Sequence, residues 1–439
     1  MGRLAVPKSL RRDADLASGS FPAEIPLTTA RHRIPCAVAL FGRFVQHGAL
    51  AIAVGDGPSW PIVGSRPGPT VGLRFSDWRT LLACALDPDL RVGEAYMDGR
   101  LRIETGTLAD FLSLALLNTE AVASGPFARP LRFLRQIRSS IVRFHPGRTA
   151  RRFVAHHYDL KDELFELFLD QDLQYSCAYF SRPDEDLETA QARKKLRLAA
   201  KLLLEPGHRV LDIGSGWGGL AIDLARLADV HVDGVTLSRS QHVASVRRAA
   251  EAGLPDRVRF ELKDYREVEG PYDRIVSVGM LEHVGRHHLG AYFRKVADLL
   301  TEDGVALIHS IGSFRDPGPR QPWMEKYIFP GSFLPPLDLV FRAIQGTPLL
   351  VTDVEILRLH YAETLKAWRE RFGLHRERIR ELYDERFARM WDLYLTGCEM
   401  VFRAGQAMVF QVQLARSPAT VPITRDYIEE FERAHEART

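Results

Sequence analysis

A glycine-rich segment within a run of alternating strands and helices constrains the fold of this chain most strongly. From Leu187 onward, apolar stretches typical of buried strands alternate with helical stretches, as in a parallel α/β sheet. The segment VLDIGSGWGG (210–219) joins one predicted strand to the next helix, and Gly214, Gly216 and Gly219 satisfy G-x-G-x-x-G. Glycine there permits a tight turn against a ligand, and the helix N-terminus offers free N–H groups. The sequence therefore predicts a Rossmann-like sheet with a small-molecule ligand at this loop, although a purely structural glycine turn is the alternative.

The loop alone does not choose the ligand, because dinucleotide-binding and S-adenosylmethionine-binding folds share it. Asp212 begins the loop, where a carboxylate can hold the glycine turn and the amino-acid end of a ligand. Where a nicotinamide enzyme would carry a ribose-binding acid, the chain offers Thr236 and Gln241, and Asp233 lies inside the strand. Asp264 ends the third strand and is expected to meet an adenine amino group. These residues favour S-adenosylmethionine over a nicotinamide cofactor.

The length of 439 residues suggests two or three domains. We expect an irregular segment at 1–35, a small α+β domain at 36–122, a basic linker at 123–152 and the main α/β domain at 153–439. In the small domain we predict three strands and two helices, at 37–41, 49–54 and 70–75 and at 77–86 and 108–117. Near the end of the chain we predict two helices and a last strand, at 364–372, 376–400 and 407–415.

Charge is unevenly distributed along the chain. The net charge of +3 is too small to imply a nucleic-acid partner. The segment 126–152, however, holds eight arginines and no acid, interleaved with apolar residues. Such a segment suits an anionic membrane surface, and a solvated basic linker is the alternative interpretation.

Several features bear on the cellular compartment. The first residues lack the apolar core of a secretory signal, and no apolar run is long enough to span a bilayer. The four cysteines are far apart, with no C-x-x-C pair and no ligand-like histidine spacing. This spacing predicts reduced thiols of a cytoplasmic protein and no metal site. The basic segment adds the expectation that the protein is peripherally associated with the inner face of the membrane.

Motifs in family order along 155–405 resemble the cyclopropane-fatty-acyl-phospholipid synthase family, which includes the mycolic acid cyclopropane synthases. The matching segments are AHHYDL (155–160), QYSCAYF (174–180), VLDIGSGWGG (210–219), GVTLSRSQ (234–241), RIVSVGMLEHVG (274–285), IHSIG (308–312), KYIFPG (326–331), LHYAETLKAW (359–368) and YLTGCEMVFRAG (394–405). The resemblance implies a class I methyltransferase domain after a small N-terminal domain. It also implies transfer of a methyl group from S-adenosylmethionine to a cis double bond of a phospholipid acyl chain, with closure of a cyclopropane ring.

The resemblance also assigns site residues. It implies a bicarbonate site at Cys177, Glu282, His309, Ile311 and Tyr361. It implies a methyl-donor site at Tyr158, Tyr175, Ser176, Gly214, Gly216, Thr236, Gln241, Tyr265 and Arg266. We add to the donor site Asp212, Trp217, Gly219, Leu237 and Asp264. Trp217 either shields the donor or packs under the loop. Cys398 matches a cysteine that the family sometimes labels as active site, but a packing role is the favoured interpretation.

The proposed methyl transfer requires residues of these types, whether or not the resemblance holds. An alkene is a weak nucleophile, so the methyl group must be held in a near-attack geometry. Transfer leaves a carbocation, which needs a dry site and aromatic faces, for which Tyr175, Tyr179, Phe180 and Tyr361 are candidates. A carboxylate facing bicarbonate must share a proton with it, so Glu282 would accept the bicarbonate hydroxyl.

Three other functions remain open at this stage. The same pocket with a displaced base would give a methyl- or methylene-branched chain without ring closure. A lipid-binding scaffold that keeps a donor-binding fold and a nicotinamide dehydrogenase are more distant alternatives. A homodimer is one option for the assembly.

Overall fold

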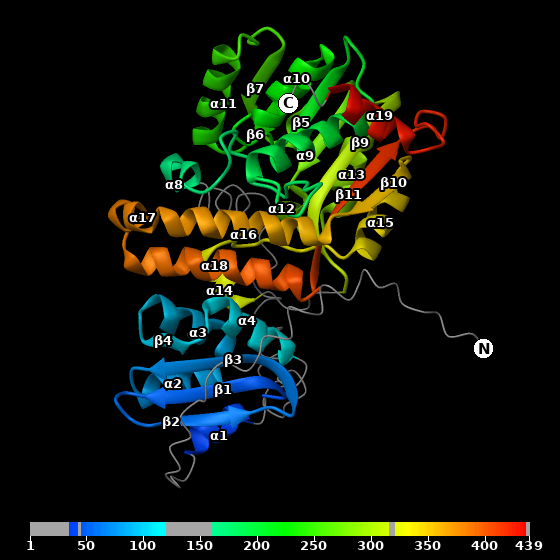
Figure 1. Ribbon diagram of the computed structural model, residues 1–439. Helices are drawn as coiled ribbons and strands as arrows, with labels where there is room; N and C mark the ends of the chain where they lie inside the picture. Colours follow the sequence, from blue (N-terminus) through cyan, green and yellow to red (C-terminus); the bar gives the residue numbers. More distant parts are fainter. Residues whose placement is uncertain (1–34, 43–44, 120–159, 316–320, 436–439) are drawn as a thin grey trace, which may run out of the picture. The chain divides into compact units, whose positions relative to one another are not determined.

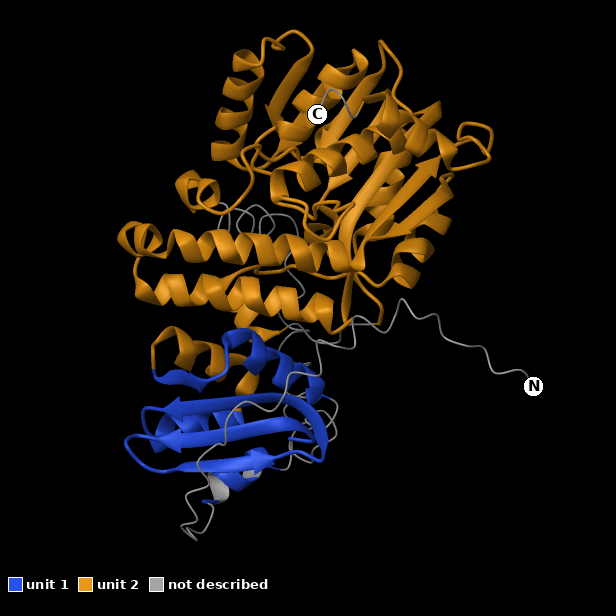
Figure 2. Ribbon diagram, viewed as in Figure 1, with its two compact units in different colours: residues 1–86, 100–125 blue, residues 87–99, 126–439 orange. Residues whose placement is uncertain are grey.

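The computed structural model describes residues 35–42, 45–119, 160–315 and 321–435. The chain forms two compact units, one of residues 1–86 and 100–125 and the other of residues 87–99 and 126–439 (Figure 2). The segment 87–99 is thus part of the second unit. The predicted irregular N-terminus up to residue 34, the basic linker and Tyr158 lie outside the described residues.

The first unit is built on a small sheet with strand order β2-β1-β3-β4. Its described elements are α1 (Cys36–Gly42), β1 (His47–Val54), β2 (Ser59–Val63), β3 (Arg66–Phe75), α2 (Trp78–Leu86), β4 (Leu101–Thr105) and α4 (Leu108–Leu117). Alternate residues of the central strands, such as Ile52 and Val71, form its core. Thr107 and Asp110 cap α4 with reciprocal hydrogen bonds, as the sequence T-x-x-D favours.

One prediction in this unit is wrong. The segment CAVALFG, predicted to contain a strand at 37–41, forms the helix α1. A short, uniformly apolar run has no periodicity that separates a strand from a helical turn. Its tertiary contacts therefore determine which of the two it forms.

The second unit contains a seven-stranded sheet with strand order β10-β11-β9-β8-β5-β6-β7. The strands are β5 (Arg209–Ile213), β6 (His231–Thr236), β7 (Val258–Leu262), β8 (Tyr272–Val278), β9 (Leu300–Ser313), β10 (Leu350–Ile356) and β11 (Ala407–Ala415). Only β11 runs against its neighbours, since it pairs antiparallel with both β9 and β10. The predicted strand–helix alternation and the last strand at 407–415 are confirmed.

Helices cover both faces of this sheet (Figure 1). One core joins α9 (Leu187–Lys201), α10 (Gly219–Ala228) and α11 (Arg239–Glu251) to strand residues such as Leu307. The other joins α13 (Leu289–Leu299) and α15 (Leu337–Gln345) to the neighbouring Ala306 and Ile308. Alternation along β9 therefore assigns odd-numbered residues such as His309 to the α9 face.

Further helices complete the unit. They are α3 (Pro88–Met97), α8 (Asp162–Glu166), η3 (Tyr265–Glu267), α12 (Leu281–Val284), α14 (Pro322–Tyr327), α16 (Arg358–Leu374), α17 (Arg376–Leu382), α18 (Glu385–Arg403) and α19 (Asp426–His435). Figure 1 shows α16 and α18 side by side, and both pack on β11. Among the described residues, no helix has the length and apolar character needed to cross a bilayer.

The predicted helix at 376–400 is in fact two helices. The backbone leaves the helical region at Tyr383, and the Asp384 side chain then caps α18 by accepting a hydrogen bond from Phe387 N (2.6 Å). Aspartate is a favoured N-cap residue, so this boundary has a local cause. Two further elements were not predicted from the sequence, namely β10, an edge strand, and α19, which packs on α9.

Candidate active site

The carboxyl ends of four parallel strands bring the predicted site residues to one edge of the sheet. Strand β5 lies between β6 and β8, so the strand order reverses beside it. Ligands of open α/β sheets bind in the crevice at such a point. The glycine loop follows β5, Thr236 ends β6, Glu282 follows β8, and His309 lies near the end of β9.

The glycine loop has a backbone that requires glycine. Gly214, Gly216 and Gly218 have φ values of 87°, 55° and 83°. The N–H groups of residues 214 and 215 both donate to the carbonyl oxygen of Val235, at 2.9 and 3.0 Å, which fixes the turn against β6. A Cβ at Gly219 would lie 2.3 Å from a carboxylate oxygen of Asp172, so the first turn of α10 has no room for a side chain.

Trp217 packs beneath this loop. Its ring is buried with its centroid 5.0 Å from that of Phe165, and its Nε1 donates to Asp162 at 3.2 Å. These contacts support the packing interpretation of Trp217.

Asp212 and Lys194 place two titratable groups under the loop. Both are buried, and Asp212 Oδ2 has no hydrogen-bond partner in the part of the chain that the structure describes. Burial raises the pKa of Asp212 to about 7, and nearby Lys194 opposes this rise. Lys194 donates to Gln174 Oε1 at 2.5 Å and to Ser176 Oγ at 2.9 Å. Burial lowers the pKa of Lys194 to about 8.

Lys194 escaped the sequence analysis because lysines on an amphipathic helix usually belong to its solvated face. On α9, however, Lys194, Leu198 and Lys201 are all buried at a spacing of four and three residues. The sequence signal that could have identified Lys194 is its position on the same helix face as the apolar residues of α9.

The remaining donor-site residues lie at the ends of β6 and β7. Thr236 Oγ1 donates to Gln241 Oε1 at 3.1 Å, so these two buried residues are adjacent, and half-buried Leu237 follows. Asp264 is buried and accepts hydrogen bonds from the guanidinium of Arg266, at 2.9 and 2.6 Å. The adenine contact predicted for Asp264 therefore remains a prediction.

An aromatic cluster contains two of the predicted site residues, Tyr175 and Tyr361. The Tyr175 hydroxyl lies 2.8 Å from that of Tyr394, and the Tyr175 ring lies 5.2 Å from Trp368. Tyr361 meets Trp368 edge-on at 5.8 Å and Phe402 at 4.9 Å. Such rings make a water-poor surface able to ease a developing positive charge.

Tyr179 and Cys177 have other surroundings. The Tyr179 ring stacks on His360 at 4.7 Å and carries the Arg197 guanidinium at 4.5 Å, so it already faces a cation. The buried Cys177 Sγ contacts Ala178 O at 3.3 Å, and burial raises the pKa of this thiol well above its ordinary value. Cys177 is thus a packed thiol beside the site.

Glu282 is the second residue of α12, the short helix that follows β8. Its Oε1 accepts a hydrogen bond of 2.6 Å from the backbone N–H of Ile311. Its Oε2 is buried and has no hydrogen-bond partner among the described residues. Burial raises the pKa of Glu282 to about 7, although the Ile311 N–H opposes this rise. A buried carboxyl oxygen without a partner matches a ligand that carries a hydroxyl group, as bicarbonate does.

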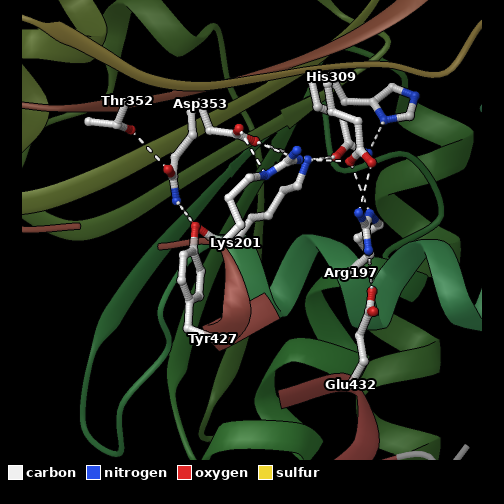
Figure 3. A network of polar contacts seen from close by, with 11 residues as sticks. Arg197, Lys201, His309, Thr352, Asp353, Tyr427 and Glu432 are labelled. Carbon is white, nitrogen blue, oxygen red and sulfur yellow. Dashed lines mark hydrogen bonds and ion pairs between the residues drawn. The ribbon is translucent and has the colours of Figure 1, made fainter. Parts of the chain in front are cut away.

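His309 lies two residues before Ile311 on β9. The side chain, labelled in Figure 3, is buried. Its Nδ1 lies 3.2 Å from Nε2 of Gln411 on β11. Burial, together with nearby Lys194 and Lys201, lowers the pKa of His309 to about 3. The imidazole is therefore neutral at physiological pH, with one N–H donor and one acceptor nitrogen.

Removing the Glu282 charge should change how stability depends on pH. An acid with a raised pKa stabilises the folded state below its unfolded-state pKa, and this contribution is lost as pH rises towards the folded-state value. For Glu282 the window runs from about 4 to about 7 and is worth at most about 3 kcal/mol. We expect Glu282→Gln to gain stability relative to the parent as pH rises through it.

Urea unfolding of both proteins at about pH 5 and pH 8 measures this difference. Asp212 titrates in the same direction in both proteins and therefore cancels. A stability difference that is equal at both pH values would contradict the assignment.

Cys398 lies on α18, where burial raises its pKa to about 12. A thiol that holds its proton this firmly is a poor nucleophile. We expect Cys398→Ala to keep kcat within about twofold of the parent and to lower the free energy of unfolding by about 1 kcal/mol. Steady-state kinetics and thermal unfolding check this, and a hundredfold loss of kcat in a folded variant would contradict it.

Comparison with known proteins places the chain among lipid-modifying methyltransferases. The sequence profile of the mycolic acid cyclopropane synthetase family matches residues 145–412. A probable fatty acid methyltransferase of Pseudomonas putida is 36% identical over 73% of this chain and 81% of its own length. The cyclopropane-fatty-acyl-phospholipid synthase of Escherichia coli K12 is 42% identical over 59% of this chain and 66% of its own length.

A solved structure agrees with the sequence matches. The mycolic acid cyclopropane synthase CmaA1, complexed with SAH and CTAB, is 35% identical, with a TM-score of 0.57 over 60% of this chain and 97% of its own length. This likeness confirms the class I methyltransferase fold and the S-adenosylmethionine donor. The chain belongs to the mycolic acid cyclopropane synthetase family and is an S-adenosylmethionine-dependent C-methyltransferase.

Proposed function

We propose that this enzyme methylates a cis double bond in a phospholipid acyl chain and closes a cyclopropane ring, using bicarbonate as the base. The observation that carries the proposal is the buried Glu282 Oε2, which lacks a partner in the described structure beside the Ile311 N–H. The similarity to the E. coli synthase supports the same activity.

Each group at the site has a defined task in this proposal. When bound, the sulfonium donor supplies an electrophilic methyl group, and bicarbonate supplies a base that removes a proton from the methylated chain. Glu282 accepts the hydroxyl of this base, because an oxyanion and a carboxylate in contact must share a proton. The Ile311 N–H holds the other Glu282 oxygen, and neutral His309 offers an N–H to the anion. The aromatic cluster excludes water, which would otherwise capture the cationic intermediate.

The glycine loop, Asp212, Thr236 and Gln241 are the proposed donor site. The backbone turn of the glycine loop against Val235 and the hydrogen bond from Thr236 to Gln241, at the carboxyl ends of β5 and β6, support this assignment. The similarity to CmaA1, which was solved in complex with SAH, supports S-adenosylmethionine as the donor.

A phospholipid substrate leads to a proposed location. Moving an acyl chain through water costs about 0.8 kcal/mol per CH₂ group. We therefore propose that the enzyme works against the inner face of the membrane from the cytoplasm and draws its substrate from the bilayer. The anionic membrane contact and a homodimer remain predictions.

A second candidate is methyl- or methylene-branching of the acyl chain without ring closure. It is favoured by the similarity to the Pseudomonas putida protein, whose name specifies a fatty acid methyltransferase and no ring. Both candidate reactions use the same residues up to the final step, in which a proton is removed from the methylated chain.

Incubation with methyl-labelled S-adenosylmethionine and vesicles of a monounsaturated phospholipid tests both candidates. We expect a labelled acyl chain, identified by mass spectrometry, whose proton NMR spectrum shows cyclopropane ring protons. A branched methyl or exocyclic methylene signal would replace the first candidate by the second. Labelling of free fatty acid alone would refute the phospholipid substrate. Turnover that is unchanged after bicarbonate is removed and restored would refute the proposed base.

A further inference from the structure

A buried polar network lies behind His309 (Figure 3). His309 on β9 and Gln411 on β11 are directly paired in the antiparallel ladder, and both are buried. Directly paired residues place their side chains on the same face of the sheet. Here they bring Gln411 Nε2 to 3.2 Å from His309 Nδ1.

Lys201 fixes the orientation of the Gln411 amide. The Lys201 Nζ lies 2.9 Å from Gln411 Oε1 and is fully buried. An ammonium group has donors and no acceptor, so the oxygen of the amide must face Lys201 and the NH₂ must face His309. Since the NH₂ is a donor, His309 Nδ1 must accept, and the single proton of the neutral ring then resides on Nε2.

Burial lowers the pKa of Lys201, and the carboxylates of Glu355 and Asp353 oppose this effect by stabilising the ammonium form. Its Nζ also donates to Glu355 Oε2 at 2.5 Å and lies 3.5 Å from Asp353. Glu355 in turn accepts from Arg197 at 2.9 and 2.7 Å, and these two cations lower the pKa of Glu355 to about 2 against the effect of burial. The carboxylate at 355 is therefore ionised and holds the ammonium against Gln411.

The outer end of the network is also fixed. Arg197 donates to Glu432 of α19 at 2.9 Å, and α19 packs on α9. Side chains already fixed by several ion pairs lose little further conformational entropy when they orient another residue. The chain Glu432–Arg197–Glu355–Lys201–Gln411 thus ends at one nitrogen of His309.

We propose that Gln411, oriented by Lys201, is a positioning residue that keeps the proton of His309 on Nε2, where it is donated to the oxyanion at Glu282. This inference rests on the proposed donor role of His309. Without Gln411, both ring tautomers are open to His309, and one of them turns a lone pair towards the anion. An acceptor at position 411 would draw the proton to Nδ1.

The test uses the full chain with ¹⁵N-labelled histidine, and NMR reports which ring nitrogen of His309 carries the proton. His309→Asn assigns its signals. The variant Gln411→Glu keeps the size of the side chain and replaces the NH₂ donor by an acceptor. We expect the proton on Nε2 in the parent and on Nδ1 in Gln411→Glu. We also expect kcat to fall about 10- to 100-fold, while the Kd of S-adenosylmethionine stays within about twofold.

Gln413→Leu is the matched control. Gln413 is on the same strand and equally buried, but its NH₂ donates to Lys201 O at 2.6 Å and to the Tyr427 hydroxyl at 3.0 Å. We expect this variant to lose stability yet keep the Nε2 proton and the turnover of the parent. If Gln411→Glu does not fold, Gln411→Met takes its place in the same NMR experiment. The methionine side chain does not fix the proton on either nitrogen, so we expect averaged ring signals from two tautomers.

Two results would overturn the proposal. One is a proton on Nδ1 in the parent, and the other is a Gln411 variant with the tautomer and kcat of the parent. The tautomer is measured without substrate or base, so it stands or falls separately from the proposed reaction. A parent with the Nε2 proton but no dependence on bicarbonate would refute the proposed base and leave the role of Gln411 in setting the tautomer intact.

Discussion

Glu282→Gln should lower kcat by about 10²- to 10⁴-fold, the range expected when a group that handles a proton is removed. The amide can still accept the Ile311 N–H, so the local fold should persist. It presents no basic oxygen, however, at the position of the buried Oε2. The Kd of S-adenosylmethionine should stay within about threefold of the parent, because Glu282 does not bind the donor in the proposed mechanism. Single-turnover kinetics and calorimetric titration of the donor measure the two effects.

Glu399→Gln is the control for loss of a buried carboxylate elsewhere in the unit. Glu399 is buried on α18 and binds Arg369 and Arg403 at 3.0 and 2.8 Å. Its loss should lower stability and leave kcat largely unchanged. If Glu282→Gln weakened donor binding as strongly as turnover, the role assigned to Glu282 would be wrong.

His309→Ala should lower kcat by about 10²-fold or more, which is the usual cost of losing a donor to an oxyanion. Because burial lowers the pKa of His309 to about 3, the loss should be the same at all pH values between about 6 and 9. His309→Gln keeps an N–H near the end of the side chain and should lose less than His309→Ala. The pH profile of kcat for the three proteins provides the measurement.

A pH-dependent loss would identify His309 as a general base or acid in place of a neutral donor. Equal losses in the alanine and glutamine variants would show that the shape of the imidazole, and not its N–H, is what matters.

The sequence was informative wherever a pattern is local. Alternating strand and helix signals predicted the sheet from β5 to β9, and the glycine spacing predicted the turn at Gly214 and Gly216. Family motifs pointed to Glu282 and His309, and the structure brings the segments that carry them together through the backbone bond from Gly279 N to His309 O. Local patterns fail where contacts with residues distant in the sequence determine the secondary structure, as in α1 and in the edge strand β10.

The groups behind the site could not be predicted for the same reason. Gln411 is one of two glutamines in an otherwise apolar strand, and its role depends on β11 lying beside β9 in one register. Lys194 and Lys201 look like solvated lysines until α9 is placed on the sheet. A single sequence shows the residue types of such a network but not the register that joins them.

The position of β11 in the sheet has a consequence for biosynthesis. This strand, residues 407–415, is buried throughout and fills the gap between β9 and β10, which precede it in the chain. While the ribosome is still making α18, β9 must carry an open, apolar edge, and such edges invite pairing with other chains. The sheet can close only after residue 415 has been added, so a nascent chain of this enzyme should depend on chaperones until this strand has left the ribosome.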